Sequence, residues 1–355
     1  MLRLSMPIRS TTWNSRGSEW YRWDPHIHAP GTVRNDQFGG NWAAYLNAIN
    51  DASPEIRALG ITDYYSIQTY REVRKWQDAG KLPKIELLFP NVEMRLDVKT
   101  EKGTGINFHL LFSPEQDDHE TEIERILSHL TFQTSVRTYQ CTRADLIALG
   151  KAREPKHMQD IPAFAEGANQ FKVSFTELRE LFRREAWLRE NCLVAVAGGR
   201  DGTAGLQGDD SFAALREEIQ GLAHIIFSGQ RSDREFWLGH NEKMDRNALE
   251  AKYGRLKPCL HGCDAHELQK VGVPDQNRYC WIKGDLAFES LRQAVIEPEE
   301  RVWIGEQPPL PPADSVTIDT IRPIGTPWLK NDVVQLSRGL VAVIGARGSG
   351  KTALV

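Results

Sequence analysis

Cysteine is scarce in this sequence, and long apolar runs are missing from it. Its five cysteines are an odd number spread from Cys141 to Cys280, which does not fit a disulfide framework and indicates a reducing compartment. A stretch of about eighteen apolar residues, as a membrane-spanning helix needs, is absent. The N-terminal residues also lack the apolar block of a secretion signal. We therefore expect a cytoplasmic protein with no membrane partner.

A strong excess of charge is missing as well, since the formal net charge is only -4. The overall field neither indicates nor excludes nucleic-acid binding, because bound metal and a local basic patch can hold phosphates. Disorder throughout is excluded, because 40% of the 355 residues are hydrophobic and 26% are charged. We find no internal repeat and no low-complexity tract.

Short apolar stretches alternate with amphipathic ones from Tyr21 to about Ile304, which is typical of βα units. The predicted strands lie near residues 55–65, 85–96, 106–112, 192–199, 224–229, 255–266 and 279–284. A charged, mainly helical insert is expected at about 114–191. The proline-rich "EQPPLPPADS" predicts a stiff linker. The expected organisation is an N-terminal arm (1–20), a barrel domain (21–304), a linker (305–317) and a further domain (318–355).

The segment 341–355, "VAVIGARGSGKTALV", matches the phosphate-binding P-loop pattern in Gly345, Gly350, Lys351 and Thr352. The apolar run from Leu340 to Ile344 predicts the buried strand that leads into such a loop. We expect the first strands of a P-loop ATPase domain whose remainder lies beyond this sequence. ATP and Mg²⁺ are then cofactors of the full-length protein only, and the chain as given is not expected to hydrolyse ATP.

The stretch "WDPHIHAPGT" is the most informative. Asp24, His26 and His28 alternate near a predicted strand end, so both imidazoles point to the same side, as two ligands of one metal must. Further carboxylates and imidazoles fall at or near the ends of other predicted strands: Asp63, Glu93, His109, Asp264 and His266. In a βα barrel such ends converge on one face, so the sequence predicts an α/β barrel with a metal site there.

With these motifs in order, residues 21–304 resemble the PHP (polymerase and histidinol phosphatase) superfamily of metal-dependent phosphoesterases. The resemblance implies a distorted, TIM-like βα barrel. The layout of this barrel followed by a P-loop is similar to that of the TrlF-type fusions with an SMC-like ATPase. That likeness implies regulation by the ATPase domain, and a homodimer formed through it is one implied arrangement.

Three departures from the family pattern affect the expected ligand set. Tyr64 replaces the histidine of the usual "ITDH", no further histidine follows His28 until His109, and "AGGRDG" places Arg200 and Asp201 where a ligand is expected. The resemblance then implies one complete site formed by His26, His28, Glu93 and Asp264. In a partial second site, Glu93 bridges to His109, and Asp201 or water completes the shell. Asp63 and His266 are the remnant of a third site, or else orient ligands and donate protons.

Mixed imidazole and carboxylate ligands favour Mn²⁺, Zn²⁺ or Fe²⁺ over an all-oxygen Mg²⁺ site. His266 is the candidate general acid, because an ordinary histidine pKa lies close to working pH. A metal-bound water is the alternative acid. Asp63 and Asp201 complete the predicted catalytic residues, and His266 counts among the predicted metal ligands.

Several other residues could have supported a second site. Cys259, His261 and Cys263 alternate and could hold zinc, although their spacing favours small buried side chains on a strand. The remaining candidates are His224 and His240 as ligands, Arg231 and Arg234 as phosphate contacts, and His119, His129 and His157 as solvated residues of the insert.

The leading hypothesis is a metal-dependent nuclease that hydrolyses phosphodiester bonds in DNA or RNA. The partner ATPase suggests this substrate class by analogy and suggests a role in phage defence or in nucleic-acid processing. Two alternatives stay open: a phosphatase of the histidinol phosphatase type, and a degenerate barrel that binds nucleic acid or a partner without chemistry. A closed pocket would favour the phosphatase, and an open groove lined by Arg200, Arg231 and Arg234 would favour nucleic acid.

Overall fold

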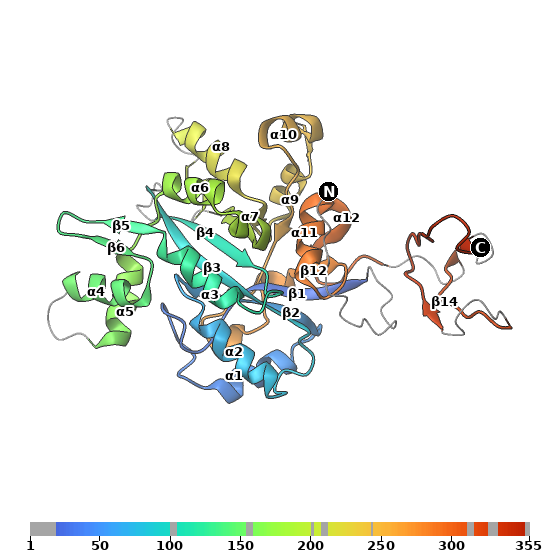
Figure 1. Cartoon of the computed structure of the whole chain (residues 1–355), viewed down its shortest axis with the longest axis horizontal. Coiled ribbons are helices and arrows are strands. Elements are labelled where there is room, and N and C mark those ends of the chain that lie inside the picture. The colour runs from blue at the N-terminus through green and yellow to red at the C-terminus, as the bar shows by residue number, and fades with distance from the viewer. Residues whose placement is uncertain are drawn as a thin grey trace.

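The computed structural model describes residues 19–99, 105–153, 159–199, 202–206, 212–242, 244–310, 316–325 and 333–351. A nine-stranded sheet forms the centre of the molecule (Figure 1). Its strands are β1 (Trp20–His28), β2 (Ile56–Tyr64), β3 (Leu87–Lys99), β4 (Gly105–Phe112), β7 (Cys192–Ala197), β8 (Ile225–Phe227), β11 (Cys259–Leu260), β12 (Tyr279–Lys283) and β13 (Val302–Gly305).

The sheet curls into a nearly closed barrel. The strand order is β11-β8-β7-β4-β3-β2-β1-β12-β13, and the two edge strands, β11 and β13, lie next to each other without a hydrogen-bonded ladder. The predicted α/β class and barrel are therefore confirmed. The simple βα series is wrong in part, because β4 runs antiparallel to both neighbours and β12 runs antiparallel to β1 and β13.

Helices cover the outside of the barrel, with α1 and α2 on one side of the sheet and α11 and α12 on another (Figure 1). The helices of the barrel itself are α1 (Trp42–Asn50), α2 (Gln68–Asp78), α8 (Ala213–Leu222), α9 (Arg231–Trp237), α10 (Arg246–Tyr253), α11 (Phe288–Ile296) and α12 (Pro298–Arg301). The short ribbon β9 (His240–Asn241) with β10 (Met244–Asp245) links α9 to α10. In α2, Tyr70 and Val73 are buried, as their spacing of three predicts.

The segment between β4 and β7 is mainly helical. It contains α3 (His119–Ser128), α4 (Arg143–Arg153), α5 (Asp160–Gln170), α6 (Phe175–Arg184), α7 (Ala186–Asn191) and the hairpin β5 (Thr131–Gln133) with β6 (Thr138–Gln140). Ser174 caps α6 by accepting a hydrogen bond from the Glu177 amide, as the capping-box pattern predicts. Glu177 does not bond back to the cap and instead accepts from the Thr131 hydroxyl.

The inward face of β3 explains where chemistry can occur. Successive side chains of a strand alternate between its two faces, so Phe89, Asn91, Glu93 and Arg95 share one face. Phe89 belongs to the apolar cluster that fills one end of the barrel. Leu88, Val92 and Met94 face the other way and pack against the helices. The barrel interior therefore changes along β3 from apolar to polar, and the polar end carries the candidate site.

The C-terminal segment lies beside the barrel, joined to it by the proline-rich stretch (Figure 1). It contains β14 (Thr320–Ile321) paired with β15 (Val334–Gln335). The predicted buried strand from Leu340 to Ile344 is wrong: these residues are irregular, with Leu340 97% and Ile344 89% exposed. A buried strand needs neighbouring strands, and no strand in the described residues pairs with this run.

Among the P-loop residues, Lys351 Nζ donates to the carbonyl oxygens of Gly345 at 2.6 Å and Ala346 at 2.9 Å, so the lysine folds back on its own loop. Gly350 has a φ of +84°, a conformation that suits glycine. Thr352 lies outside the described residues. In the described part of residues 318–355 the structure has the β14–β15 pair and does not show further strands of the expected ATPase domain.

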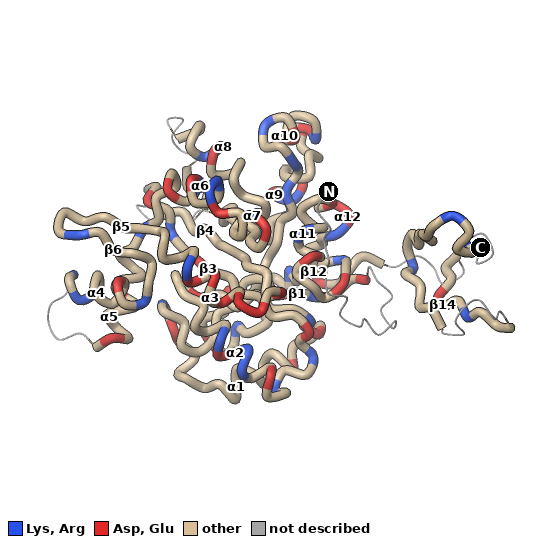
Figure 2. The backbone as a smooth tube through the Cα atoms, viewed as in Figure 1, with Lys and Arg blue, Asp and Glu red and all other residues tan. Residues whose placement is uncertain are grey.

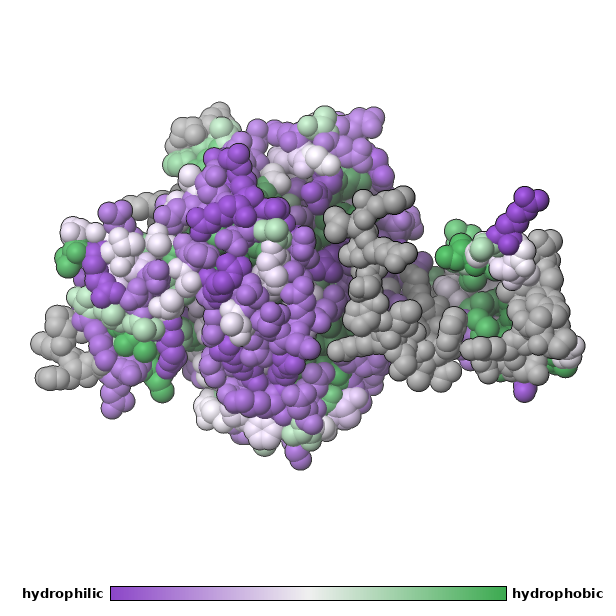
Figure 3. Space-filling model, in the orientation of Figure 1, coloured by the Kyte–Doolittle hydropathy of each residue, from purple (hydrophilic) through white to green (hydrophobic). Residues whose placement is uncertain are grey.

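Acidic and basic side chains are interspersed over the helices and turns (Figure 2). The face of the barrel seen in Figure 3 is largely hydrophilic, with small scattered apolar areas. In the part of the chain that the structure describes, every helix is too short or too polar to cross a lipid bilayer.

Candidate metal centre

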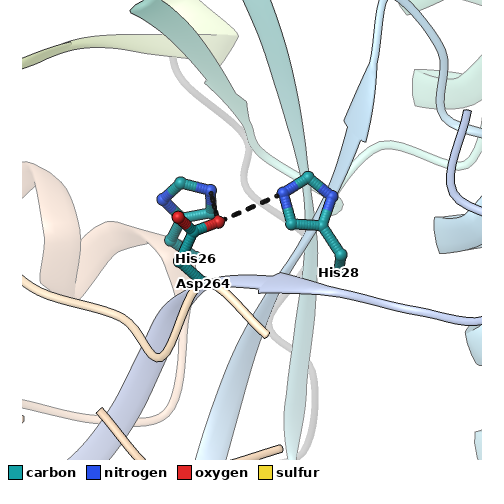
Figure 4. A group of neighbouring side chains, drawn as sticks. All are labelled: His26, His28 and Asp264. Carbon is teal, nitrogen blue, oxygen red and sulfur yellow. Dashed lines mark ion pairs between the residues drawn. The ribbon is translucent and has the colours of Figure 1, made fainter. Parts of the chain in front are cut away.

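Four side chains from three parts of the chain meet at the polar end of the barrel. His26 and His28 lie on β1, Glu93 lies on β3, and Asp264 lies in the loop after β11. Asp264 Oδ1 is 3.2 Å from His26 Nε2 and 3.4 Å from His28 Nε2 (Figure 4). Glu93 Oε2 is 3.5 Å from each of the same two nitrogen atoms. Four potential ligand atoms therefore surround one point.

These atoms fit a divalent metal. His26 Nε2, His28 Nε2 and Glu93 Oε2 are buried and have no hydrogen-bond partner, and such groups are costly unless something binds them. Tetrahedral ligands held at about 2.0 Å from zinc lie about 3.3 Å apart, close to the four observed separations. Asp264 is the exposed member, with 60% of its side chain accessible, so the centre opens to solvent on that side.

His109 adds a second group of ligand atoms. His26, Glu93 and His109 each offer one atom, and the three atoms lie within 4.8 Å of one another. His109 stands directly across the ladder from Glu93, in the middle of both strands. Asn91 Oδ1 lies 3.0 Å from His109 Nδ1 and accepts its proton, which leaves Nε2 free to bind a metal. The predicted partner Asp201 lies outside the described residues.

Asp63 supports His28 through one of its two carboxylate oxygens. Asp63 Oδ1 accepts from the Thr32 hydroxyl at 3.2 Å and from the amides of Val33 and Tyr64 at 2.9 Å each. Thr32 Oγ1 in turn lies 3.0 Å from His28 Nδ1 and accepts its proton. This chain of hydrogen bonds presents His28 Nε2 to the centre. These contacts suit a residue that orients a ligand, one of the two roles that the sequence left open for Asp63, while Asp63 Oδ2 is buried without a hydrogen-bond partner.

Tight backbone packing places Asp264. Asp264 adopts a left-handed φ of +48°, and its amide donates to the His26 carbonyl oxygen at 2.9 Å. Buried Asp24 accepts a hydrogen bond from the Cys263 amide at 3.1 Å and so holds the preceding residue. Gly262 permits this approach, because a β-carbon there would lie 2.5 Å from the His26 carbonyl oxygen and 2.7 Å from Asp24 Oδ1.

We expect Gly262→Ala to weaken metal binding and to lower stability by about 1 to 3 kcal/mol, because the added methyl group must displace backbone next to His26. Calorimetric metal titration and chemical denaturation measure the two effects. Gly221→Ala is the matched control. Gly221 lies in α8 with open space around it, so alanine there should raise the free energy of unfolding by about 0.5 to 1 kcal/mol. Unchanged metal affinity in Gly262→Ala would refute this role for the glycine.

His266 and Tyr64 form an aromatic stack with His28. The His266 ring lies 4.1 Å and the Tyr64 ring 5.1 Å from the His28 ring, centroid to centroid. Burial and the nearby His28 lower the pKa of His266 to about 4. A histidine with this pKa is neutral at pH 7, which argues against His266 as the general acid. His266 Nε2 lies 3.7 Å from Asp264 Oδ1, so the ring borders the centre.

Charge is strongly coupled within the centre. Burial alone would lower the pKa of His26, but Asp264 and Glu93 raise it to about 10. Burial would raise the pKa of Glu93, but His26 and His28, each 3.5 Å away, hold it well below its usual range. Burial and the nearby His26 lower the pKa of His109 to about 3. Without metal, the centre therefore holds protonated His26 between carboxylates and keeps His109 neutral.

An open pocket of about 370 Å³ adjoins the centre. His26, His109 and Asp264 form one wall. The other polar residues around it are Asn107, Ser228, Gln230, Asp233, His261, Asp275 and Arg278. A ligand in this pocket would therefore touch His26 on β1, His109 on β4 and Asp264 in the loop after β11.

The other histidines considered from the sequence lie away from the centre. His224 Nδ1 accepts from the Val194 amide at 3.0 Å, and His240 pairs with Glu299 at 3.0 Å, so neither is a ligand here. His119 is fully buried and bonds to Tyr70, so the prediction of a solvated side chain is wrong for it. His129 is partly exposed, as predicted. His157 lies outside the described residues.

The cysteines and arginines also have other roles. Cys259 is buried on β11, Cys263 lies against Asp24, and His261 faces the pocket, so the three do not form a zinc site. Arg231 pairs with Glu235 at 2.7 Å in solvent. Arg234 lies over Trp303 at 5.0 Å and donates to the Val302 carbonyl oxygen. Arg200 lies outside the described residues, so the described part of the groove is not lined by the predicted arginines.

Comparison with known proteins gives little further guidance. No protein-family model matches the chain, and no curated protein matches it. Among the solved structures that are similar to this chain is one described as that of a candidate metal-dependent phosphoesterase from Bifidobacterium adolescentis, at 12% sequence identity and a TM-score of 0.36. The similarity covers 78% of this chain and 96% of that one. Likeness at this level assigns no activity, so the functional conclusion depends on the geometry of the centre.

Proposed function

We propose that this protein is a metal-dependent phosphoesterase that hydrolyses phosphodiester bonds in nucleic acid. One observation carries the proposal: Asp264 Oδ1 and three buried, unpartnered atoms of His26, His28 and Glu93 surround one point beside an open polar pocket. Such a mixed nitrogen and oxygen set suits Zn²⁺, Mn²⁺ or Fe²⁺. When bound, such an ion polarises a phosphoryl oxygen and lowers the pKa of water toward neutrality.

The chain's own residues supply position and charge. Thr32 and Asp63 fix the ring of His28, and Asn91 fixes the ring of His109, so the nitrogens that face the centre are the unprotonated ones. Arg278 lines the pocket together with Asp233 and Asp275, and its guanidinium donates to the carbonyl oxygens of Asp275 and Gly229 at 3.1 Å each. It brings a positive charge to a pocket that also contains carboxylates.

The shape of the pocket favours a polymer over a small phosphomonoester. A small substrate is usually enclosed on most of its surface, whereas this pocket is open and bordered by the exposed Asp264. An open site lets a strand enter and leave without a free end. A small-molecule phosphatase is therefore the second candidate, and a binding module without chemistry is the third.

The test is cleavage of labelled single-stranded and double-stranded DNA, RNA and tRNA, and of p-nitrophenyl phosphate, with Mn²⁺, Zn²⁺ or Mg²⁺ added. We expect a polymer to be cut and Glu93→Gln to cut it at least about 100-fold more slowly, because loss of a group that merely supports a ligand already costs 10 to 100-fold. Glu250→Gln, a substitution at an exposed position on α10, is the matched control and should keep full activity.

Each other outcome changes the conclusion. Equal cleavage by Glu93→Gln and the wild type would mean that the activity does not come from this centre. Hydrolysis of p-nitrophenyl phosphate alone would establish the second candidate. Absence of both cleavage and bound metal would leave a binding module. Control by an SMC-like ATPase, and a role in phage defence or nucleic-acid processing, are the wider parts of the proposal, and comparing the full-length protein with and without ATP tests them.

A further inference from the structure

Three cations gather beside the metal centre without carboxylate partners. Arg34 lies in the loop after β1, Arg95 lies on β3, and Lys172 lies between α5 and α6. Within the described residues none of the three forms an ion pair with a carboxylate. Arg34 Nη1 and Arg95 Nε are buried and have no hydrogen-bond partner. Buried guanidinium donors without partners are costly, which indicates a site for an anion.

The backbone brings these three side chains together. Gly105 lies between two of them, because a β-carbon added there would lie 3.2 Å from Arg95 Cβ and 3.6 Å from Lys172 Cδ. The Val173 amide donates to the Arg95 carbonyl oxygen at 2.9 Å, which fixes the segment carrying Lys172 against β3. Arg34 lies over the ring of Tyr64, at 5.3 Å from its centroid.

The three positive charges also act on one another. Burial, followed by the nearby Arg95 and Arg34, lowers the pKa of Lys172 to about 8. Burial and the nearby Arg95 also lower the pKa of Arg34. A cluster that destabilises itself in this way gains from any anion that binds it.

The cluster lies two residues further along β3 than the metal ligand Glu93. Glu93 and Arg95 share the inward face of β3, and two residues along a strand span about 6 to 7 Å. Across the ladder, Glu93 faces His109 and Arg95 faces Asn107, and these two partners line the same pocket. An extended ligand could therefore place one phosphate at the metal ligands and another at the cations.

We infer that Arg34, Arg95 and Lys172 form a subsite for a second phosphate group, the one next to the phosphate held at the metal centre. Identifying that ligand as a substrate rests on the proposed function, whereas anion binding by the cluster does not. The same chemistry could come from a nucleic-acid strand or from a nucleoside bisphosphate, and the test separates the two sources.

The test measures binding without metal, so it does not depend on catalysis. Fluorescence anisotropy follows a labelled (dT)8 on protein treated with EDTA, over a range of salt concentrations. Arg95→Gln should weaken (dT)8 binding at least about 10-fold. It should also reduce the slope of log affinity against log salt concentration by about one, the value for one lost phosphate contact. Lys172→Gln should also weaken binding and reduce the salt dependence. It tests the subsite independently if Arg95→Gln fails to fold. Unlabelled thymidine 3′,5′-bisphosphate and inorganic phosphate serve as competitors.

The outcomes separate the alternatives. If the bisphosphate competes as well as unlabelled (dT)8 does, at equal concentrations of adjacent phosphate pairs, the ligand is a small molecule. If only (dT)8 competes, the ligand is a nucleic-acid strand. Arg231→Gln is the matched control, since Arg231 is exposed and paired with Glu235, and its binding should stay within twofold of the wild type. Equal binding by Arg95→Gln, Lys172→Gln and the wild type would overturn the subsite. A lower melting temperature in both cluster variants with unchanged salt dependence would also overturn it, because it would indicate a merely structural role.

Discussion

Replacing His26 by alanine should remove bound metal almost completely and lower the proposed phosphoesterase activity at least about 100-fold. The reason is its place in both groups of potential ligands: His26 Nε2 lies 3.2 Å from Asp264 Oδ1 and 3.5 Å from Glu93 Oε2, and His26 also groups with Glu93 and His109. A two-metal centre needs both groups. An imidazole nitrogen binds one ion at a time, so His26 completes whichever of the two groups holds an ion, and its loss leaves either group with two of its three members.

Two single substitutions make this expectation specific. Asp264 belongs only to the first group and His109 only to the second, so Asp264→Ala and His109→Ala should each lose one ion and keep the other. Metal content per chain, measured by mass spectrometry after dialysis, distinguishes two, one and zero ions. His129→Ala, at a partly exposed histidine outside the centre, should retain the wild-type content. Full metal content in His26→Ala would contradict the shared role of His26.

Much of this centre could be predicted from residue spacing. Alternation places His26 and His28 on one side of a strand, and the structure has both on β1 facing Glu93. The sequence was less informative about direction. It suggested that the ligands fall at strand ends, yet Glu93 and His109 face each other in the middle of two antiparallel strands. Strand direction depends on how a connection folds back, and spacing alone does not contain that information.

The supporting residues could not be predicted, because their roles depend on contacts between distant segments. Asn91 accepts from His109 and also donates to the Pro25 carbonyl oxygen, across 18 and 66 residues respectively. Lys172 approaches Arg95 only because residues 171–173 fold against β3. One signal was available, since Arg95 follows Glu93 by two residues and therefore shares its face of the strand. This spacing alone predicts that Arg95 and Glu93 face the same interior.

Loop geometry was the other limit. The expected strand over 255–266 is only Cys259–Leu260 in the structure, and Asp264 is placed by a left-handed turn rather than by a strand end. Left-handed φ values are rare outside glycine, and the Asp24 hydrogen bond that supports this turn comes from β1. A pattern within the loop itself therefore could not predict where the carboxylate would point.

Metal affinity should rise steeply with pH. In the metal-free centre, burial opposes protonation of His26, but Asp264 and Glu93 raise its pKa to about 10. A metal must displace that proton, so each unit of pH below about 10 should cost about tenfold in affinity. Burial also opposes protonation of His28, but Asp264 and Glu93 raise its pKa as well, so the apparent affinity should rise at least about 100-fold between pH 6 and 8. Because the pKa values of Glu93 and Asp264 are lowered, both stay ionised throughout this range and add no pH dependence.

Metal-free stability should change in the opposite direction. The folded pKa of His26 is raised above the ordinary 6.5, so its ion pairs stabilise the folded state fully below about pH 6.5. That contribution is lost as pH rises toward 10. The difference in melting temperature between metal-loaded and metal-free protein should therefore widen from pH 6 to pH 8.

Calorimetric titration with Mn²⁺ at pH 6, 7 and 8, in buffers of different ionisation enthalpy, counts the protons released per ion. Asp264→Asn should flatten the pH dependence by removing the main charge that holds the His26 proton, even though the affinity itself also falls. His109 is the matched control histidine: burial and the nearby His26 lower its pKa to about 3, so it is already neutral and releases no proton. In His109→Ala, the affinity for the remaining ion should then keep the pH dependence of the wild type. Equal metal affinities at pH 6 and 8 in the wild type would show that His26 is unprotonated in the metal-free protein. Asp264 and Glu93 would then not raise its pKa in the way that this prediction requires.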